Sequence, residues 1–177
     1  MENTMTKTRK ITISAIVIAL YVVIMVITQS FAFGAIQVRL ATSLYSLSYI
    51  FPFLALPLGL ANVLSNMLLG GLGIFDIIGG GLVGIITALL VYAVRKYKLN
   101  IYFTILPIIF IPGLIVPIWL SMLLNVPYSA LAISLCLGQV IPAILGLFLI
   151  NAFMVALPLP KSSSQTLSVK VSRKDMM

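Results

Sequence analysis

Long apolar runs recur along this chain of 177 residues and leave few ways for it to fold. The chain is 62% hydrophobic and 8% charged, whereas a soluble domain is about half apolar and about a quarter charged. A domain of this size cannot bury the excess, because it still exposes much of its surface. The strands of a membrane barrel alternate apolar and polar residues, and these runs do not. The sequence therefore predicts an all-α integral membrane protein.

Most basic residues lie between or outside the apolar runs. The net charge is +8, and the Lys and Arg residues gather mainly in the two tails and in the cluster Arg95, Lys96 and Lys98. Cytoplasmic loops and tails of membrane proteins collect such residues, whereas a nucleic-acid-binding domain concentrates them on one face. We therefore expect both termini to be cytoplasmic, a lipid bilayer around the chain, and no nucleic-acid partner.

Six membrane crossings account for the pattern of apolar runs. Residues 11–30 supply roughly the 20 residues that span the hydrocarbon. Three more crossings follow before the basic cluster and return it to the side of the N-terminus, and a further two lie between residues 100 and 156. The predicted organisation is a tail at residues 1–10, a six-helix transmembrane domain at residues 11–158, and a basic, disordered cytoplasmic tail at residues 159–177.

Helix-breaking residues mark the predicted turns. The three middle crossings are expected at residues 41–56, 57–70 and 76–94. Pro52 and Pro57 separate the first of these from the second, because proline lacks the amide proton of a helical hydrogen bond. The glycines of residues 70–73 are expected to form the next turn, and Asn125 and Pro127 the turn between the last two crossings.

The residue types present exclude most chemistry. The chain has no His, and Asp76 is the one carboxylate outside the tails. General acid–base catalysis usually needs a pair of titratable groups, and a zinc site needs three or four ligands. No phosphate-binding loop motif is present. We therefore expect no enzyme activity, no metal site and no cofactor, and we interpret the single Cys136 as a buried apolar residue.

Polar residues within the apolar region are the candidate site. Such groups are costly in a membrane and usually serve a function. Asn62 and Asn66 lie one helical turn apart and share a face. Amide, hydroxyl, guanidinium and carboxylate groups together suit a small, polar, planar solute. The residues expected around one outward-facing pocket are Gln37, Arg39, Thr42, Tyr45, Asn62, Asn66, Asp76, Trp119 and Gln139.

Each of these residues also has a simpler interpretation. Asp76 suits the N-cap of a helix, and the Arg39 side chain suits a position extended towards the headgroups. Asn62, Asn66 and Gln139 are suited to hydrogen bonds between helices. Trp119 is equally suited to anchoring the chain at the membrane interface.

Small residues recur at one-turn spacing in two of the predicted helices. Ala15 and Ala19 allow another helix to approach closely, either within the bundle or from a partner subunit. Gly80, Gly84 and Ala88 form a similar stripe, for which packing within the bundle is favoured.

Three segments resemble a known family. FGAIQVR at residues 33–39, LANVLSN at residues 60–66 and GGLGIFDIIG at residues 70–79 resemble the QueT family of S components, the substrate-binding subunits of energy-coupling factor (ECF) transporters. The resemblance implies an S-component-like bundle in the plasma membrane of a prokaryote. It also implies uptake of a queuosine precursor, a 7-deazaguanine base such as queuine or preQ1, together with a transmembrane coupling subunit and a pair of ATPase subunits.

The resemblance also implies roles for individual residues. Asp76 would accept hydrogen bonds from a guanine-like edge, the amides of Asn62, Asn66 and Gln37 would meet the remaining polar atoms, and Arg39 would bind a carbonyl or close the first loop. Tyr45 or Trp119 would stack on the ring, and Ala15 and Ala19 would form the docking face for the coupling subunit.

One position departs from the family pattern. Thr42 stands where the family has a glutamate, so another precursor or another vitamin, such as cobalamin or riboflavin, stays open as the ligand. A self-contained oligomeric carrier or channel, and an assembly protein without a ligand, are the alternatives from other functional classes.

Overall fold

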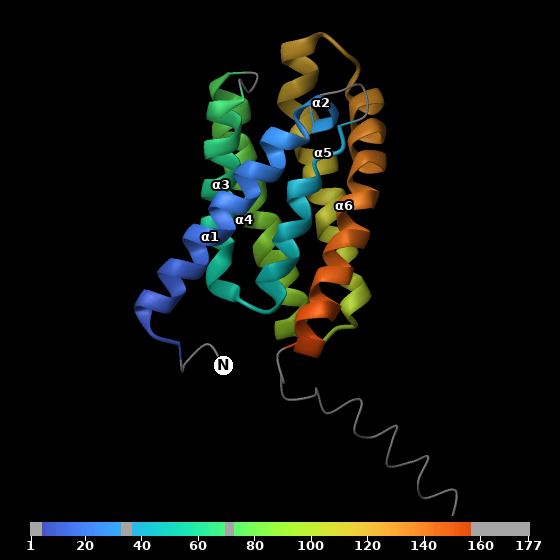
Figure 1. Cartoon of the computed structure of the whole chain (residues 1–177). Coiled ribbons are helices and arrows are strands. Elements are labelled where there is room, and N and C mark those ends of the chain that lie inside the picture. Colours follow the sequence, from blue (N-terminus) through green and yellow to red (C-terminus); the bar gives the residue numbers. More distant parts are fainter. Residues whose placement is uncertain (1–4, 33–36, 70–72, 157–177) are drawn as a thin grey trace, which may run out of the picture.

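The fold is a bundle of helices. The computed structural model describes residues 5–32, 37–69 and 73–156, and within these ranges it contains helices and no strand. The long helices are α1 (Lys7–Ile27), α4 (Ile74–Lys96), α5 (Ile105–Leu124) and α6 (Tyr128–Ala156). The shorter segments are α2 (Gln29–Ala32), η2 (Leu40–Tyr49), η3 (Pro52–Leu54), α3 (Ala55–Leu68) and η4 (Ile101–Thr104). In Figure 1, α1 lies along one side of the bundle, and the cyan segment η2 runs through its middle.

Four helical segments are long and apolar enough to cross a membrane. They are Lys7–Ile27, Ile74–Lys96, Ile101–Leu124 and Tyr128–Ala156. The predicted all-α membrane fold is confirmed to this extent, and the predicted count of six crossings stays open, because the segments near residues 41–56 and 57–70 are shorter. The start of α1 and the ends of α4 and α6 lie at the same end of the bundle (Figure 1). The side of the membrane that this end faces stays a prediction from the basic residues.

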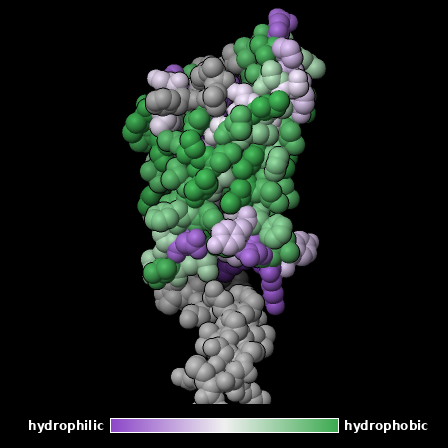
Figure 2. Space-filling model, turned by 90° about the vertical axis from the view of Figure 1, so that its right-hand side faces the viewer, coloured by the Kyte–Doolittle hydropathy of each residue, from purple (hydrophilic) through white to green (hydrophobic). Residues whose placement is uncertain are grey.

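The outer surface of the bundle is apolar. Large hydrophobic side chains are exposed on every long helix, for example Ile16, Leu82, Ile118 and Phe148. On the face drawn in Figure 2, hydrophobic residues form a broad band, with hydrophilic residues towards both ends of the molecule. Exposure of such a surface to water would be unfavourable, whereas contact with the hydrocarbon of a bilayer is not.

The first of the shorter segments differs from its prediction. Residues 40–49 form the 3-10 helix η2, which packs against α6 and α4. The chain breaks at Ile50 and Phe51, several residues before the predicted boundary between residues 56 and 57. Pro52 then opens η3, and Pro57 lies in the first turn of α3. A missing amide proton costs nothing at those positions, because the first amides of a helix have no intrahelical acceptor.

Arg95 fixes the far end of η2. Its Nη1 atom donates hydrogen bonds to the backbone carbonyls of Tyr49 at 2.8 Å and Ile50 at 2.9 Å. The guanidinium carbon also lies 6.0 Å from the centre of the Tyr49 ring. Carbonyls at a helix C-terminus have no intrahelical donor, so Arg95 satisfies them and holds η2 against α4. The basic cluster therefore has a structural role in addition to its predicted topological one.

Three other sequence predictions can be compared with the structure. The first helix begins at Lys7, before the predicted start at residue 11, because the Thr6 hydroxyl accepts a hydrogen bond from the Arg9 amide and caps it. Cys136 is a free, half-buried thiol that packs closely on Gly113 of α5. The tail predicted at residues 159–177 and most of the glycine turn at residues 70–73 lie outside the described residues.

Candidate functional site

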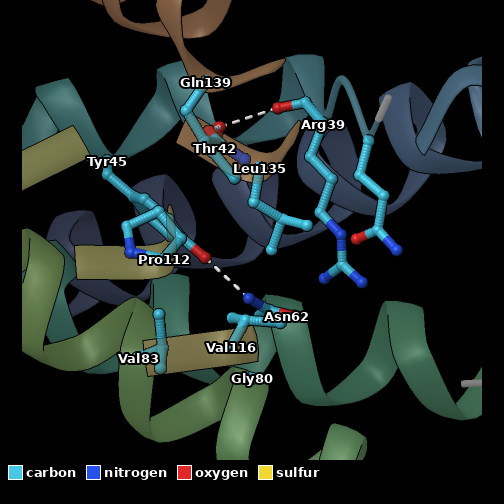
Figure 3. A pocket seen from close by; sticks show the side chains of 11 residues that line it. Arg39, Thr42, Tyr45, Asn62, Gly80, Val83, Pro112, Val116, Leu135 and Gln139 are labelled. Carbon is cyan, nitrogen blue, oxygen red and sulfur yellow. Dashed lines mark hydrogen bonds between the residues drawn. The ribbon is translucent and has the colours of Figure 1, made fainter. Parts of the chain in front are cut away.

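Polar side chains from the segment before η2, from η2, from α3 and from α6 meet inside the bundle. Figure 3 shows them around a cavity whose remaining walls come from α4, α5 and α6. The lining residues are Gln37, Arg39, Thr42, Tyr45, Asn62, Gly80, Val83, Pro112, Val116, Leu135 and Gln139. The structure therefore brings together most of the polar residues that the sequence singled out, although they are spread over more than a hundred positions of the chain.

The cavity is small. The volume that the centre of a water molecule can occupy is about 10 Å³, which is room for about one water molecule. A larger solute enters only if lining side chains move apart.

Arg39 and Asp76 form a buried ion pair beside this cavity. Arg39 Nη2 lies 3.9 Å from Asp76 Oδ2, and the two residues are 6% and 1% exposed. Trp119 Nε1 donates a hydrogen bond of 3.3 Å to Asp76 Oδ1. Arg39 lines the cavity, whereas Asp76 and Trp119 lie outside its lining. A charge this deeply buried is stable only when it is paired, so the pairing of these two side chains accounts for their burial inside the bundle.

This arrangement overturns two of the simpler interpretations. The N-cap of α4 is Gly73, with φ +88°, and Asp76 lies in the first turn of the helix instead. Glycine adopts that backbone conformation without the steric cost that a side chain adds. Arg39 is buried against Asp76 and does not extend to the headgroups.

Two asparagines of α3 use their amide nitrogens inside the bundle. Asn62 Nδ2 donates a hydrogen bond of 2.7 Å to the Tyr45 hydroxyl, which itself lies 3.2 Å from the Tyr21 hydroxyl of α1. Asn66 Nδ2 donates a hydrogen bond of 2.9 Å to the backbone carbonyl of Asp76. A carbonyl only accepts, so this bond fixes which end of the Asn66 amide is the nitrogen.

The oxygens of these two amides and of the Gln37 amide are buried. Among the described residues, Asn62 Oδ1, Asn66 Oδ1 and Gln37 Oε1 have no hydrogen-bond donor. Leaving a buried acceptor unsatisfied costs about 1–3 kcal/mol. For Gln37 and Asn62, which line the cavity, this is typical of a site whose polar groups are satisfied by a ligand, whereas Asn66 lies outside the lining.

Thr42 joins η2 to α6. Its hydroxyl lies 2.7 Å from the backbone carbonyl of Arg39 and 2.7 Å from the Gln139 side-chain amide. A hydroxyl has one proton, so it donates to the Arg39 carbonyl and accepts from Gln139 when the amide nitrogen faces it. Gln139 thus has the interhelical role that its simpler interpretation predicted, at a position that also lines the cavity.

Two site features escaped the sequence analysis. A Cβ atom on Gly80 would lie 2.6 Å from Asn66 Nδ2 and 3.0 Å from Asn62 Oδ1, so only glycine leaves room for both amides. Tyr21 is fully buried with Val17 and Met25 on one face of α1. These three residues are spaced one helical turn apart, and that spacing in the sequence indicates a buried face that includes Tyr21.

Ala15 and Ala19 lie on the exposed face of α1. The alternative of packing within the bundle is therefore wrong for this pair, while docking of a partner stays a prediction. For the glycine stripe the favoured alternative is confirmed: Ala88 is fully buried, and a Cβ on Gly84 would lie 2.9 Å from the Tyr45 hydroxyl.

Comparison with known families decides the identity. The family model described as QueT transporter matches residues 11–155. The chain belongs to the QueT transporter family. The match runs from α1 to the end of α6 and confirms the resemblance carried by the three short segments. QueT proteins are membrane transporters and not enzymes, which agrees with the residue types of this chain. No curated protein and no solved structure gives a significant match.

Proposed function

We propose that this QueT protein is the substrate-binding S component of an ECF importer and that it captures a 7-deazaguanine base from outside the cell. Two buried amide oxygens on the cavity wall support the proposal, because Gln37 Oε1 and Asn62 Oδ1 have no partner in the described part of the chain. A 7-deazaguanine offers donors at N1–H, at the 2-amino group and at N9–H. Each hydrogen bond gained there would remove the penalty of an unsatisfied acceptor.

The remaining groups of the cavity suit the rest of the base. Arg39 would donate to the O6 carbonyl, and the Tyr45 ring offers an aromatic surface beside the amides. Stacking of a base on an aromatic ring contributes about 1–3 kcal/mol. Because the cavity admits about one water molecule, a bicyclic base is more easily accommodated by side-chain movement than a vitamin as large as cobalamin.

The energy for uptake is expected from partner subunits. The sequence has no phosphate-binding loop, and Asp76, its one carboxylate outside the tails, is paired with Arg39. A carrier driven by protons normally keeps a relay of ionisable groups in its helices. The exposed Ala15 and Ala19 on α1 would provide the close-packing surface for the coupling subunit.

Titration of the purified full-length chain with 7-deazaguanine tests the capture role. We expect saturable binding, which weakens at least about tenfold in Asn62→Ala, the change that removes one acceptor from the cavity wall (about 1.4 kcal/mol). Asn151→Ala is the matched control, because Asn151 is exposed on α6. Absence of saturation with the wild-type chain would eliminate the capture role. Flux of the base into liposomes that contain this chain alone would instead favour a self-contained carrier.

A further inference from the structure

The charges around the cavity are unusually few. The sequence has carboxylates at Glu2, Asp76 and Asp175, so Asp76 is the only one between residues 3 and 174. The polar groups on the cavity wall other than Arg39 are amides and hydroxyls. Arg39 and Asp76 are therefore the two charged side chains that could compensate a charge on a ligand in this cavity.

Those two charges already neutralise each other. Asp76 faces Arg39 through one carboxylate oxygen and accepts from Trp119 through the other. Arg39 lies on the cavity wall and Asp76 lies behind it. An ammonium group in the cavity would meet the guanidinium first, and reaching the carboxylate would require breaking the existing pair.

The unpartnered groups disfavour an anion. Gln37 Oε1 and Asn62 Oδ1 belong to cavity-lining residues and are acceptors without donors in the described residues. They would repel a carboxylate or phosphate oxygen and would accept from an N–H group. Burial of either ionic form without a counter-charge is costly.

We infer that the site selects a deazapurine whose substituent at position 7 is uncharged at neutral pH. This inference rests on the proposed function and narrows the set of ligands expected for it. The nitrile of 7-cyano-7-deazaguanine fits the neutral cavity, whereas the ammonium groups of preQ1 and of queuine do not. The base itself supplies the N–H donors in all of these compounds, so the charge of the substituent is the property that separates them.

A series of ligands that differ in that charge tests the inference. The purified full-length chain is titrated at neutral pH with 7-cyano-, 7-aminomethyl- and 7-carboxy-7-deazaguanine, which share the base and differ little in size. We expect the cyano compound to bind at least about tenfold more tightly than either charged compound. Equal binding of the three, or tighter binding of a charged one, would overturn the inference and leave the proposed function intact. Failure of all three to bind would overturn both.

A pair of matched variants tests the physical cause. Gln37→Glu adds a carboxylate to the cavity wall at nearly constant shape, and we expect it to shift the preference towards the aminomethyl compound by at least about tenfold. Gln29→Glu makes the same chemical change at an exposed position of α2 and should leave the preference unchanged. An unchanged preference in Gln37→Glu, in a variant that elutes as a single species and retains its helical circular dichroism, would contradict the inference.

Discussion

The hydroxyl of Tyr21 on α1 lies 3.2 Å from the hydroxyl of Tyr45 on η2. Tyr45 also accepts the amide hydrogen bond of Asn62, so a short chain of hydrogen bonds runs from α1 to the cavity. The opposite face of α1 exposes Ala15 and Ala19. The helix that we propose as the docking surface is thereby bonded directly to the site that we propose for the ligand.

Tyr45→Phe tests the importance of this chain. The substitution removes the acceptor of Asn62 Nδ2 and the partner of Tyr21, and we expect a loss of about 1–3 kcal/mol in stability together with weaker ligand binding. Thermal unfolding in detergent and ligand titration measure the two effects. Tyr97→Phe, at an exposed tyrosine, is the control and should change neither.

Variants of the Arg39–Asp76 ion pair test its roles in stability and in binding of the base. Asp76→Asn leaves the buried guanidinium without its counter-charge, and we expect a loss of about 3–5 kcal/mol. The double variant Arg39→Gln, Asp76→Asn removes both charges, so it should recover much of the stability without recovering the binding of the base. Unfolding and binding measured on the single and double variants separate the structural role from the binding role. Full binding by the double variant would show that the pair serves stability alone.

Arg95 is expected to act on the site from a distance. Arg95→Ala removes the donor to the carbonyls of Tyr49 and Ile50, and we expect a loss of about 1–3 kcal/mol in stability. Because η2 carries Thr42 and Tyr45, the affinity for the base should fall as well. Lys96→Ala removes a neighbouring exposed charge and should have little effect on either quantity. Equal effects of the two variants would contradict the proposed positioning role.

Substitution of the exposed alanines of α1 is expected to impair assembly with the coupling subunit and to leave ligand binding unchanged. Ala15→Leu with Ala19→Leu adds bulk to the outer face of α1, where neither residue touches the core. The isolated chain should bind its ligand as before, whereas co-purification with the coupling subunit should be lost, because the helices can no longer approach closely. Val23→Leu, at another exposed position of α1, should assemble normally. Normal assembly of the double variant would exclude this face as the docking surface.

Much of the architecture follows from hydropathy alone. Residues 76–94 were predicted as one crossing and lie within α4, and the turn at Asn125 falls between α5 and α6. Such long apolar runs have one stable solution in a bilayer, since every backbone amide must be paired within its own segment. The 3-10 conformation of residues 40–49 was not predictable from this pattern, because the contacts of η2 with α4 and α6 decide it.

The composition of the site was partly predictable. Gln37, Arg39, Asn62 and Asp76 are polar residues in an apolar region, and that contrast identified them. Their pairing was not accessible, because the sequence does not indicate that Arg39 and Asp76 would meet across 37 positions. The apolar lining residues, such as Val83 and Val116, have no distinguishing feature in an apolar chain, and the fold alone places them at the cavity.

The small molecule that this protein retains tests the capture role most directly. The full-length chain, purified from cells in a mild detergent, is denatured, and the accurate mass of whatever it releases is measured. Asn62→Ala and Asn151→Ala preparations are measured beside it. We predict a 7-deazaguanine mass in the wild-type and Asn151→Ala samples and its loss from Asn62→Ala. Release of an unrelated vitamin, or of nothing from a wild-type chain that also fails to bind added base, would contradict the account.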